Sequence, residues 1–106
     1  TAHLSLARRL IRRHLPDAAL APTLIAGLLG ISVRHLHILF EETEMSFSET
    51  VTALRLAQSR RLLREQSGRT IAEVAFACGF ESLATFYRLF SASESMTPGD
   101  YRARLA

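Results

Sequence analysis

Apolar residues recur at helical spacing between positions 70 and 90, and a single glycine interrupts them. The first half of this stretch places Ile71, Val74 and Ala75 on one face of a helix. Thr70 and Glu73 have the three-residue spacing of a capping box, in which each side chain accepts from the backbone N–H of the other residue. The pattern therefore predicts a short amphipathic helix that begins just after Thr70.

A turn and a second helix follow. Gly79 is predicted to form the turn, because a sharp turn needs a residue that tolerates positive φ. Ser82 is an N-cap candidate for the next helix. That helix repeats the apolar spacing and is expected to expose its other side, which carries Ala84, Tyr87, Arg88 and Ser91. Two short helices joined by a glycine turn form a helix-turn-helix unit.

The same plan occurs earlier in the chain, in residues 22–40. Ala26 and Gly30 stand four residues apart, as Ala75 and Gly79 do. Pro22 suits the first position of a helix, and residues 45–49 parallel residues 96–100. The sequence therefore predicts a duplicated unit of about fifty residues.

The segment between the two copies contains neither proline nor glycine, which predicts one long helix at about residues 47–66. Gly68 is expected to end it in a left-handed conformation. The arginines Arg60, Arg61 and Arg64 are expected to face outward. The apolar surface for both flanking units is predicted at Val51, Leu54, either Leu56 or Ala57, Leu62 and Leu63.

These elements predict an all-α fold in a single domain, residues 1–106. The first helix-turn-helix unit is expected at about residues 21–44 and the second at about 70–93, with a C-terminal helix at about 97–105. A helix of nineteen residues is about 28 Å long. Two helices mounted at its ends could then enter successive major grooves of B-DNA, which are about 34 Å apart.

Charge and cysteine content narrow the class of protein. All thirteen basic side chains are arginine, and the net charge is +3, which favours an anionic partner. Residues 1–16 carry four arginines and no acid, whereas residues 17–50 carry one arginine against five acids. The single cysteine cannot form an internal disulfide, and no apolar run has the length of a membrane span or a signal peptide. We therefore expect a cytoplasmic protein that does not enter a membrane.

Catalytic and metal chemistry find little support in the sequence. His35 and His37 are two residues apart and point to different helix faces, without a further ligand at suitable spacing. Cys78 lies on the apolar side of the predicted turn, where burial raises rather than lowers the pKa of a thiol. No phosphate-binding glycine loop is present. We therefore expect neither an enzyme nor a bound cofactor or metal.

The paired units resemble the DNA-binding domain of the AraC/XylS family of bacterial transcription regulators. The resemblance rests on IAEVAFACGFESLATFYRLF followed by MTPGDYR, and it extends from about residue 4 to residue 104. It implies seven helices that bind double-stranded DNA as a monomeric unit through two recognition helices. It also implies a separate sensing or dimerisation domain, which this chain is expected to lack.

The resemblance also implies which side chains face the bases. Arginine at such positions can donate twice to guanine O6 and N7, although an exposed surface arginine is the alternative reading for Arg34 and Arg88. Thr85 could contact a thymine methyl group or simply occupy the third position of its helix. The implied set is Arg34, His37 and Ile38 in the first recognition helix and Leu83, Ala84, Thr85 and Arg88 in the second.

Several residues depart from the family pattern. Ile38 and Leu83 stand where polar side chains are common, and Glu41 and Glu42 replace basic residues. Two further positions, Glu44 and Ser95, carry residues where the family typically has glycine, and are expected to adopt a left-handed or alternative backbone geometry. The acidic first unit leaves open a second reading, a helical module that docks on RNA polymerase or on a partner regulator.

Overall fold

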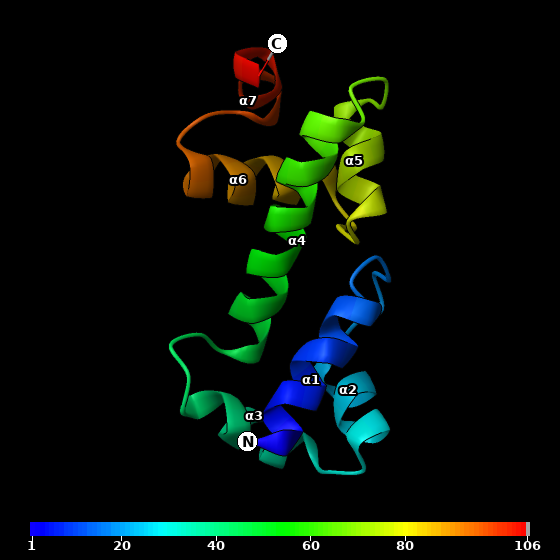
Figure 1. Ribbon diagram of the computed structural model, residues 1–106, viewed down its shortest axis with the longest axis vertical. Helices are drawn as coiled ribbons and strands as arrows, with labels where there is room; N and C mark the ends of the chain where they lie inside the picture. The colour runs from blue at the N-terminus through cyan, green and yellow to red at the C-terminus, as the bar shows by residue number, and fades with distance from the viewer. Residues whose placement is uncertain (106) are drawn as a thin grey trace. The chain divides into compact units, whose positions relative to one another are not determined.

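The computed structural model describes residues 1–105, and these residues form seven α-helices and no strand (Figure 1). This confirms the predicted all-α fold. The chain divides into two compact units, here called unit 1 (Thr1–Leu54) and unit 2 (from Arg55 onward). The helices are α1 (Ala2–Arg13), α2 (Pro22–Leu29), α3 (Val33–Glu41), α4 (Phe47–Glu65), α5 (Ile71–Ala77), α6 (Leu83–Glu94) and α7 (Pro98–Leu105).

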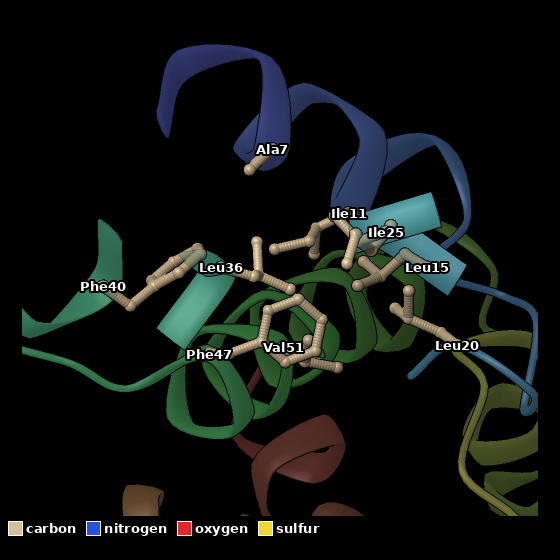
Figure 2. Packing of buried hydrophobic residues seen from close by; sticks show 10 residues of the cluster. Ala7, Ile11, Leu15, Leu20, Ile25, Leu36, Phe40, Phe47 and Val51 are labelled. Carbon is tan, nitrogen blue, oxygen red and sulfur yellow. The ribbon is translucent and has the colours of Figure 1, made fainter. Parts of the chain in front are cut away.

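Unit 1 encloses a core between α1, α2, α3 and the start of α4. The helix α1 packs against both α2 and α3. Phe40 and Phe47 meet edge to face, with ring centroids 5.7 Å apart. Figure 2 shows how the buried side chains converge; they include Ala7, Ile11, Leu15, Leu20, Ile25, Leu36, Phe40, Phe47 and Val51.

Unit 2 has a more aromatic core. Phe86 lies between Phe80 and Phe90, with ring centroids at 5.0 and 5.5 Å, and Tyr101 meets Phe90 edge to face at 5.5 Å. The second half of α4 contributes buried Leu56, Leu62 and Leu63. Of the two alternatives that the sequence left open, Leu56 is the buried residue and Ala57 is exposed.

The two glycine turns have the same hydrogen-bonding pattern. Gly30 and Gly79 adopt positive φ of 71° and 95°. In unit 1 the N–H of Ile31 donates to the carbonyl of Ala26 at 3.0 Å, and in unit 2 the N–H of Phe80 donates to the carbonyl of Ala75 at 3.1 Å. These bonds satisfy carbonyls that the helix end would otherwise leave unpaired. The predicted correspondence of the two turns is confirmed.

The helix starts follow the sequence signals. Thr70 and Glu73 form the predicted capping box, with bonds of 3.0 and 2.8 Å, and Ser46 forms the same arrangement with Glu49 at 3.1 and 2.9 Å. The bonds from the capping residues lower the pKa of both glutamates. At the start of α2, Ala21 offers no side-chain cap, and Pro22 occupies the first turn.

The expectation about the end of α4 is wrong. Gly68 does not have positive φ. The guanidinium of Arg102 on α7 instead donates to the carbonyls of Leu63, Gln66 and Arg69, at 3.4, 3.3 and 2.5 Å. Because these bonds satisfy carbonyls at and beyond the end of α4, the segment needs no left-handed glycine there.

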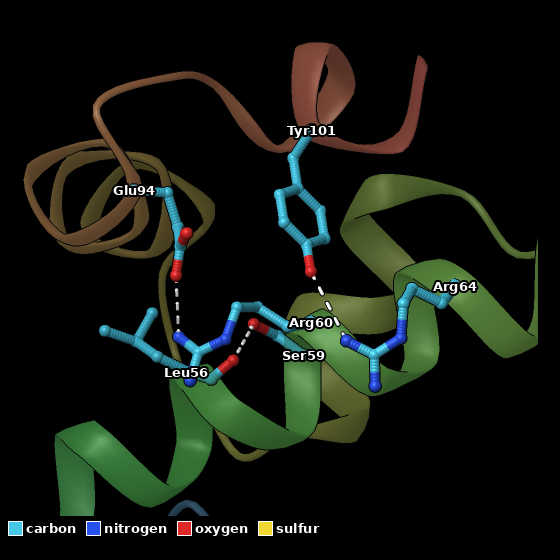
Figure 3. Close-up of polar contacts among 6 residues, drawn as sticks. All are labelled: Leu56, Ser59, Arg60, Arg64, Glu94 and Tyr101. Carbon is cyan, nitrogen blue, oxygen red and sulfur yellow. Dashed lines mark hydrogen bonds and ion pairs between the residues drawn. The ribbon is translucent and has the colours of Figure 1, made fainter. Parts of the chain in front are cut away.

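Arg60 also does not face freely outward. Its Nη1 lies 2.9 Å from Oε1 of Glu94 on α6, and both side chains are less than a third exposed (Figure 3). Arg64 Nη1 lies 3.4 Å from the hydroxyl of Tyr101. A helical wheel places arginines by the apolar face of their own helix, so it does not reveal a partner 34 residues away.

No single helix in residues 1–105 is long and apolar enough to cross a membrane. Taken together, α2 and α3 have sufficient length and apolar composition, but they bend by 98° at the turn between them. That angle is typical of a helix-turn-helix, in which the two helices cross at about 90–120°.

Candidate nucleic-acid interface

The second helix of unit 1, α3, has one buried face and one exposed face. Leu36 and Phe40 are buried in the core of unit 1. The residues expected to face DNA, Arg34, His37 and Ile38, are all exposed, and Ile38 retains 44% of its accessible surface. Ser32 caps the helix by accepting from the N–H of His35 at 3.0 Å, which fixes the start of the exposed face.

The second helix of unit 2, α6, repeats this division less completely. Phe86 and Phe90 are buried, and Ala84 and Arg88 are exposed. Leu83 is half-buried and packs against the core of unit 2. Thr85 is also half-buried; it occupies the third position of α6, and its N–H donates to Ser82 Oγ at 3.2 Å. The candidate residues are therefore brought to one face in α3 but divided between surface and core edge in α6.

Electrostatic surroundings differ between these two helices. Neither Arg34 nor Arg88 forms an ion pair within residues 1–105, so both guanidiniums can bind a partner. Beyond the exposed face of α3, Glu41 and Glu42 add two exposed carboxylates. The corresponding end of α6 carries Glu94, whose charge is paired with Arg60. A phosphate backbone would therefore meet more repulsion at the end of α3.

The described part of the chain contains no group of three or more His, Cys, Asp or Glu side chains that could hold a metal ion. Burial raises the pKa of Cys78 to about 11. At neutral pH this cysteine is therefore a protonated core residue, as its sequence position suggested.

Comparisons with known proteins agree with this geometry. Residues 25–104 match the family model described as a helix-turn-helix domain. A crystal structure of a transcriptional regulator from Chromobacterium violaceum, described as an AraC-type DNA-binding domain-containing protein, is 30% identical and superposes with a TM-score of 0.89. The superposition covers 99% of this chain and 93% of that one.

The chain belongs to the AraC-type helix-turn-helix family.

One relative of this AraC-type chain is much longer. The HTH-type transcriptional regulator GlxA of Rhizobium meliloti (strain 1021) is 45% identical over 77% of this chain, and the match covers 25% of GlxA. The chain therefore spans about a quarter of that relative's length. The DNA-binding domain of AdpA, crystallised in complex with a target DNA, has the same fold, with a TM-score of 0.85 at 24% identity over 95% of this chain and 90% of that one. The family and fold are those of DNA-binding transcription regulators.

One repeat within this AraC-type chain is not apparent from its glycines and caps. The segment LSLARRLIRR, residues 4–13, aligns without gaps with LAQSRRLLRE, residues 56–65. The alignment pairs buried Ala7 with buried Ser59 and buried Ile11 with buried Leu63. Because α1 and the second half of α4 pack on their units in the same register, their arginines occupy equivalent positions. This alignment could have been found from the sequence.

Proposed function

We propose that this chain binds double-stranded DNA sequence-specifically through α3 and α6 and thereby takes part in transcription regulation. The observation that carries the proposal is the division of both second helices. Each buries two large apolar side chains and exposes, on its other side, an arginine without an ion-pair partner in residues 1–105. A helix of this kind can enter the major groove, where arginine reads guanine.

Each candidate residue has a role that its chemistry supports. Arg34 and Arg88 would each donate two hydrogen bonds to one guanine. His37 can donate to or accept from a base edge, and Ile38 and Ala84 can contact a thymine methyl group. The half-buried Leu83 and Thr85 are proposed to contact DNA only with the atoms that remain exposed.

We further propose that the two helices occupy successive major grooves. The α4 helix has 19 residues, which corresponds to about 28 Å. A rod of this length, with a recognition helix offset at each end, supports a spacing of about 34 Å between the two recognition helices, which is one turn of B-DNA. The proposed site is therefore two half-sites about one helical turn apart.

The remaining proposals concern partners and location. A regulator alters transcription by acting on RNA polymerase or on the access of the polymerase to DNA. We therefore also propose that this chain contacts RNA polymerase. The exposed carboxylates Glu41 and Glu42, which phosphates would repel, support a protein contact near the end of α3. Such a protein would act in the cytoplasm, and we propose no catalytic step for it.

The test begins with selection of bound sites from random duplexes, followed by fluorescence-anisotropy titrations at two salt concentrations. Arg34→Ala and Arg88→Ala are each expected to cost about 1–3 kcal/mol on the selected site, with much smaller losses on unrelated DNA. Arg61→Ala is the matched control, because Arg61 is paired with Glu65 on α4. Absence of salt-dependent binding to any duplex would refute the proposal, and equal losses on all sequences would reduce both arginines to phosphate contacts.

A further inference from the structure

Unit 2 uses the arginines of its repeated segment internally. Arg60 pairs with Glu94 at 2.9 Å, and Arg64 lies 3.4 Å from the Tyr101 hydroxyl (Figure 3). The third arginine, Arg61, is held along its own helix: its Nε donates to Gln58 Oε1 at 3.1 Å, and its Nη1 lies 3.2 Å from Glu65. All three guanidiniums thus have a carboxylate, amide or hydroxyl partner.

In unit 1 the equivalent arginines lack these partners. The gapless alignment places Arg8, Arg9 and Arg12 of α1 at the positions of Arg60, Arg61 and Arg64. It also places Leu6 where Gln58 stands and Arg13 where Glu65 stands. The parallel between residues 45–49 and 96–100 extends by one position to place Thr50 opposite Tyr101. None of the four arginines of α1 forms an ion pair within residues 1–105, and all four are exposed.

Arg8 differs from the other three in its surroundings. It opens on a cavity of about 420 Å³ that is also lined by Glu42 and Glu44, although no ion pair forms between them. These carboxylates offset the charge of Arg8. Arg9, Arg12 and Arg13 have no acid on their own helix.

Leu6 adds an apolar centre to this surface. It retains 40% of its accessible area, and it precedes Arg9 by three residues and Arg13 by seven, so the three share one side of α1. Arginine is enriched at protein interfaces, and the centre of an interface is more apolar than the rest of the protein surface. A DNA backbone would leave this leucine without an apolar contact. We call Leu6, Arg9, Arg12 and Arg13 the α1 arginine surface.

We propose that the α1 arginine surface docks an acidic amphipathic segment of a partner protein. A carboxylate of that segment would take, on Arg9, the place that Glu65 takes on the equivalent Arg61 of unit 2. Further carboxylates would pair with Arg12 and Arg13, and an apolar side chain would cover Leu6. Unit 2 supplies the template for the recognition, because Arg61, the equivalent of Arg9, binds a carboxylate at 3.2 Å. Such charge-assisted pairs are stronger than neutral hydrogen bonds.

The experiment uses two synthetic alanine-based helical peptides of identical composition. One carries glutamates at i, i+3 and i+4 spacing around a central leucine, and the other has the same residues in scrambled order. Binding to the chain is followed by NMR through the backbone amides and the arginine Nε–H signals. We expect shifts confined to α1 with the first peptide, and at least about tenfold weaker binding in the Leu6→Ala/Arg9→Ala/Arg13→Ala triple variant.

The matched control is Arg61→Ala, which changes the equivalent position in α4 and is expected to leave peptide binding unchanged. Circular dichroism of each variant checks that its helices remain. Equal binding of the scrambled peptide, shifts that also cover Arg34 and Arg88, or no binding of either peptide would each overturn the proposal. Duplex DNA titration of the triple variant separates the remaining alternative: a salt slope lowered by about two phosphate equivalents would assign this surface to the DNA backbone and overturn the docking of a protein. An unchanged DNA affinity, with peptide binding lost, supports it.

Discussion

Units 1 and 2 share their turn geometry but differ in what holds the recognition helix. In both, the turn is fixed by a glycine with positive φ and by a backbone hydrogen bond to a carbonyl of the preceding helix. Unit 2 adds polar contacts from α4 to α6 through Arg60 and Glu94, and from α7 to the end of α4 through Arg102. In unit 1, Val51 stands in the place of Arg102 and is part of the apolar core.

The difference shows that the duplicated fold depends on the core and turns, while side chains at its edges are free to diverge. In unit 2 the arginines of the repeated segment are bound internally, and two of them join α4 to α6 and to α7. In unit 1 those arginines are exposed and unpaired. We therefore expect unit 2 to be the more rigid DNA reader, and unit 1 to offer more surface to other partners.

The largest predicted effects come from core truncation. Phe86→Ala in unit 2 and Leu36→Ala in unit 1 each remove a fully buried side chain. We expect losses in the free energy of unfolding of about 3–5 kcal/mol for Phe86 and about 2–5 kcal/mol for Leu36, measured by urea denaturation. Amide hydrogen exchange should show faster opening chiefly in the unit that carries the substitution. Equal loss of protection in both units would mean that they unfold as one, despite their separate cores.

The next prediction concerns base reading. Substituting each base pair of the selected site in turn should cost about 1–3 kcal/mol where α6 binds and less where α3 binds. The reason is that α3 presents Ile38 and ends at Glu41, which repels phosphate, whereas the acid at the end of α6 is paired. Greater sensitivity in the half-site of α3 would contradict this asymmetry.

The substitution Ile38→Arg sharpens the same comparison. If the new guanidinium meets the backbone, the salt slope should steepen by about one phosphate equivalent; if it meets a base edge, a guanine preference should appear. Leu28→Arg is the matched control, because Leu28 is a similarly exposed apolar residue on α2. Equal effects of both substitutions would show that only net charge matters.

Sequence patterns predicted much of this fold because the decisive interactions are local. Capping boxes, glycine turns and apolar spacing each involve residues three to seven positions apart, and Thr70, Ser82 and Gly79 behave as their chemistry requires. Gly68 and Arg60 were misread because their conformations depend on Arg102 and Glu94, more than thirty residues away along the chain. For the base-facing set, the fold shows which atoms are exposed, but contact with DNA stays a prediction.

A smaller effect is expected from the helix starts that differ between units. Ala21 and Thr70 precede α2 and α5 in equivalent places, but only Thr70 caps its helix. We expect Thr70→Ala to lower, and Ala21→Ser to raise, the free energy of unfolding by about 1 kcal/mol each at pH 7. Thermal unfolding of both variants checks this. A change of the same sign in the free energy of unfolding of both variants would contradict this prediction.

The capping box also makes one of these effects dependent on pH. Its hydrogen bonds lower the pKa of Glu73 from its ordinary value near 4.5. A carboxylate with a lowered folded pKa stabilises the fold above its unfolded pKa, and that contribution disappears as the pH falls through the folded value. The cost of Thr70→Ala should therefore shrink between pH 7 and pH 3, while the gain from Ala21→Ser, which involves no carboxylate, should change less. An increase of the Thr70→Ala cost toward acid would contradict this assignment.

The smallest predicted effect distinguishes the ends of the two recognition helices. Ser95 ends α6 with φ of 58°, and it is the only non-glycine residue with positive φ in residues 1–105. Because a Cβ disfavours this conformation, Ser95→Gly should stabilise unit 2 by about 0.5–1 kcal/mol.

After α3, Glu44 avoids positive φ, and Thr43 Oγ1 lies 2.7 and 2.6 Å from the carbonyl oxygens of Phe40 and Met45. Glycine at 44 would therefore relieve no strain and only increase the freedom of the unfolded chain, so Glu44→Gly should destabilise unit 1 by about 0.5–1 kcal/mol. Urea denaturation of both variants, each compared with the parent, decides the matter; stabilisation by both glycines would show that the two helix ends share one backbone geometry in solution.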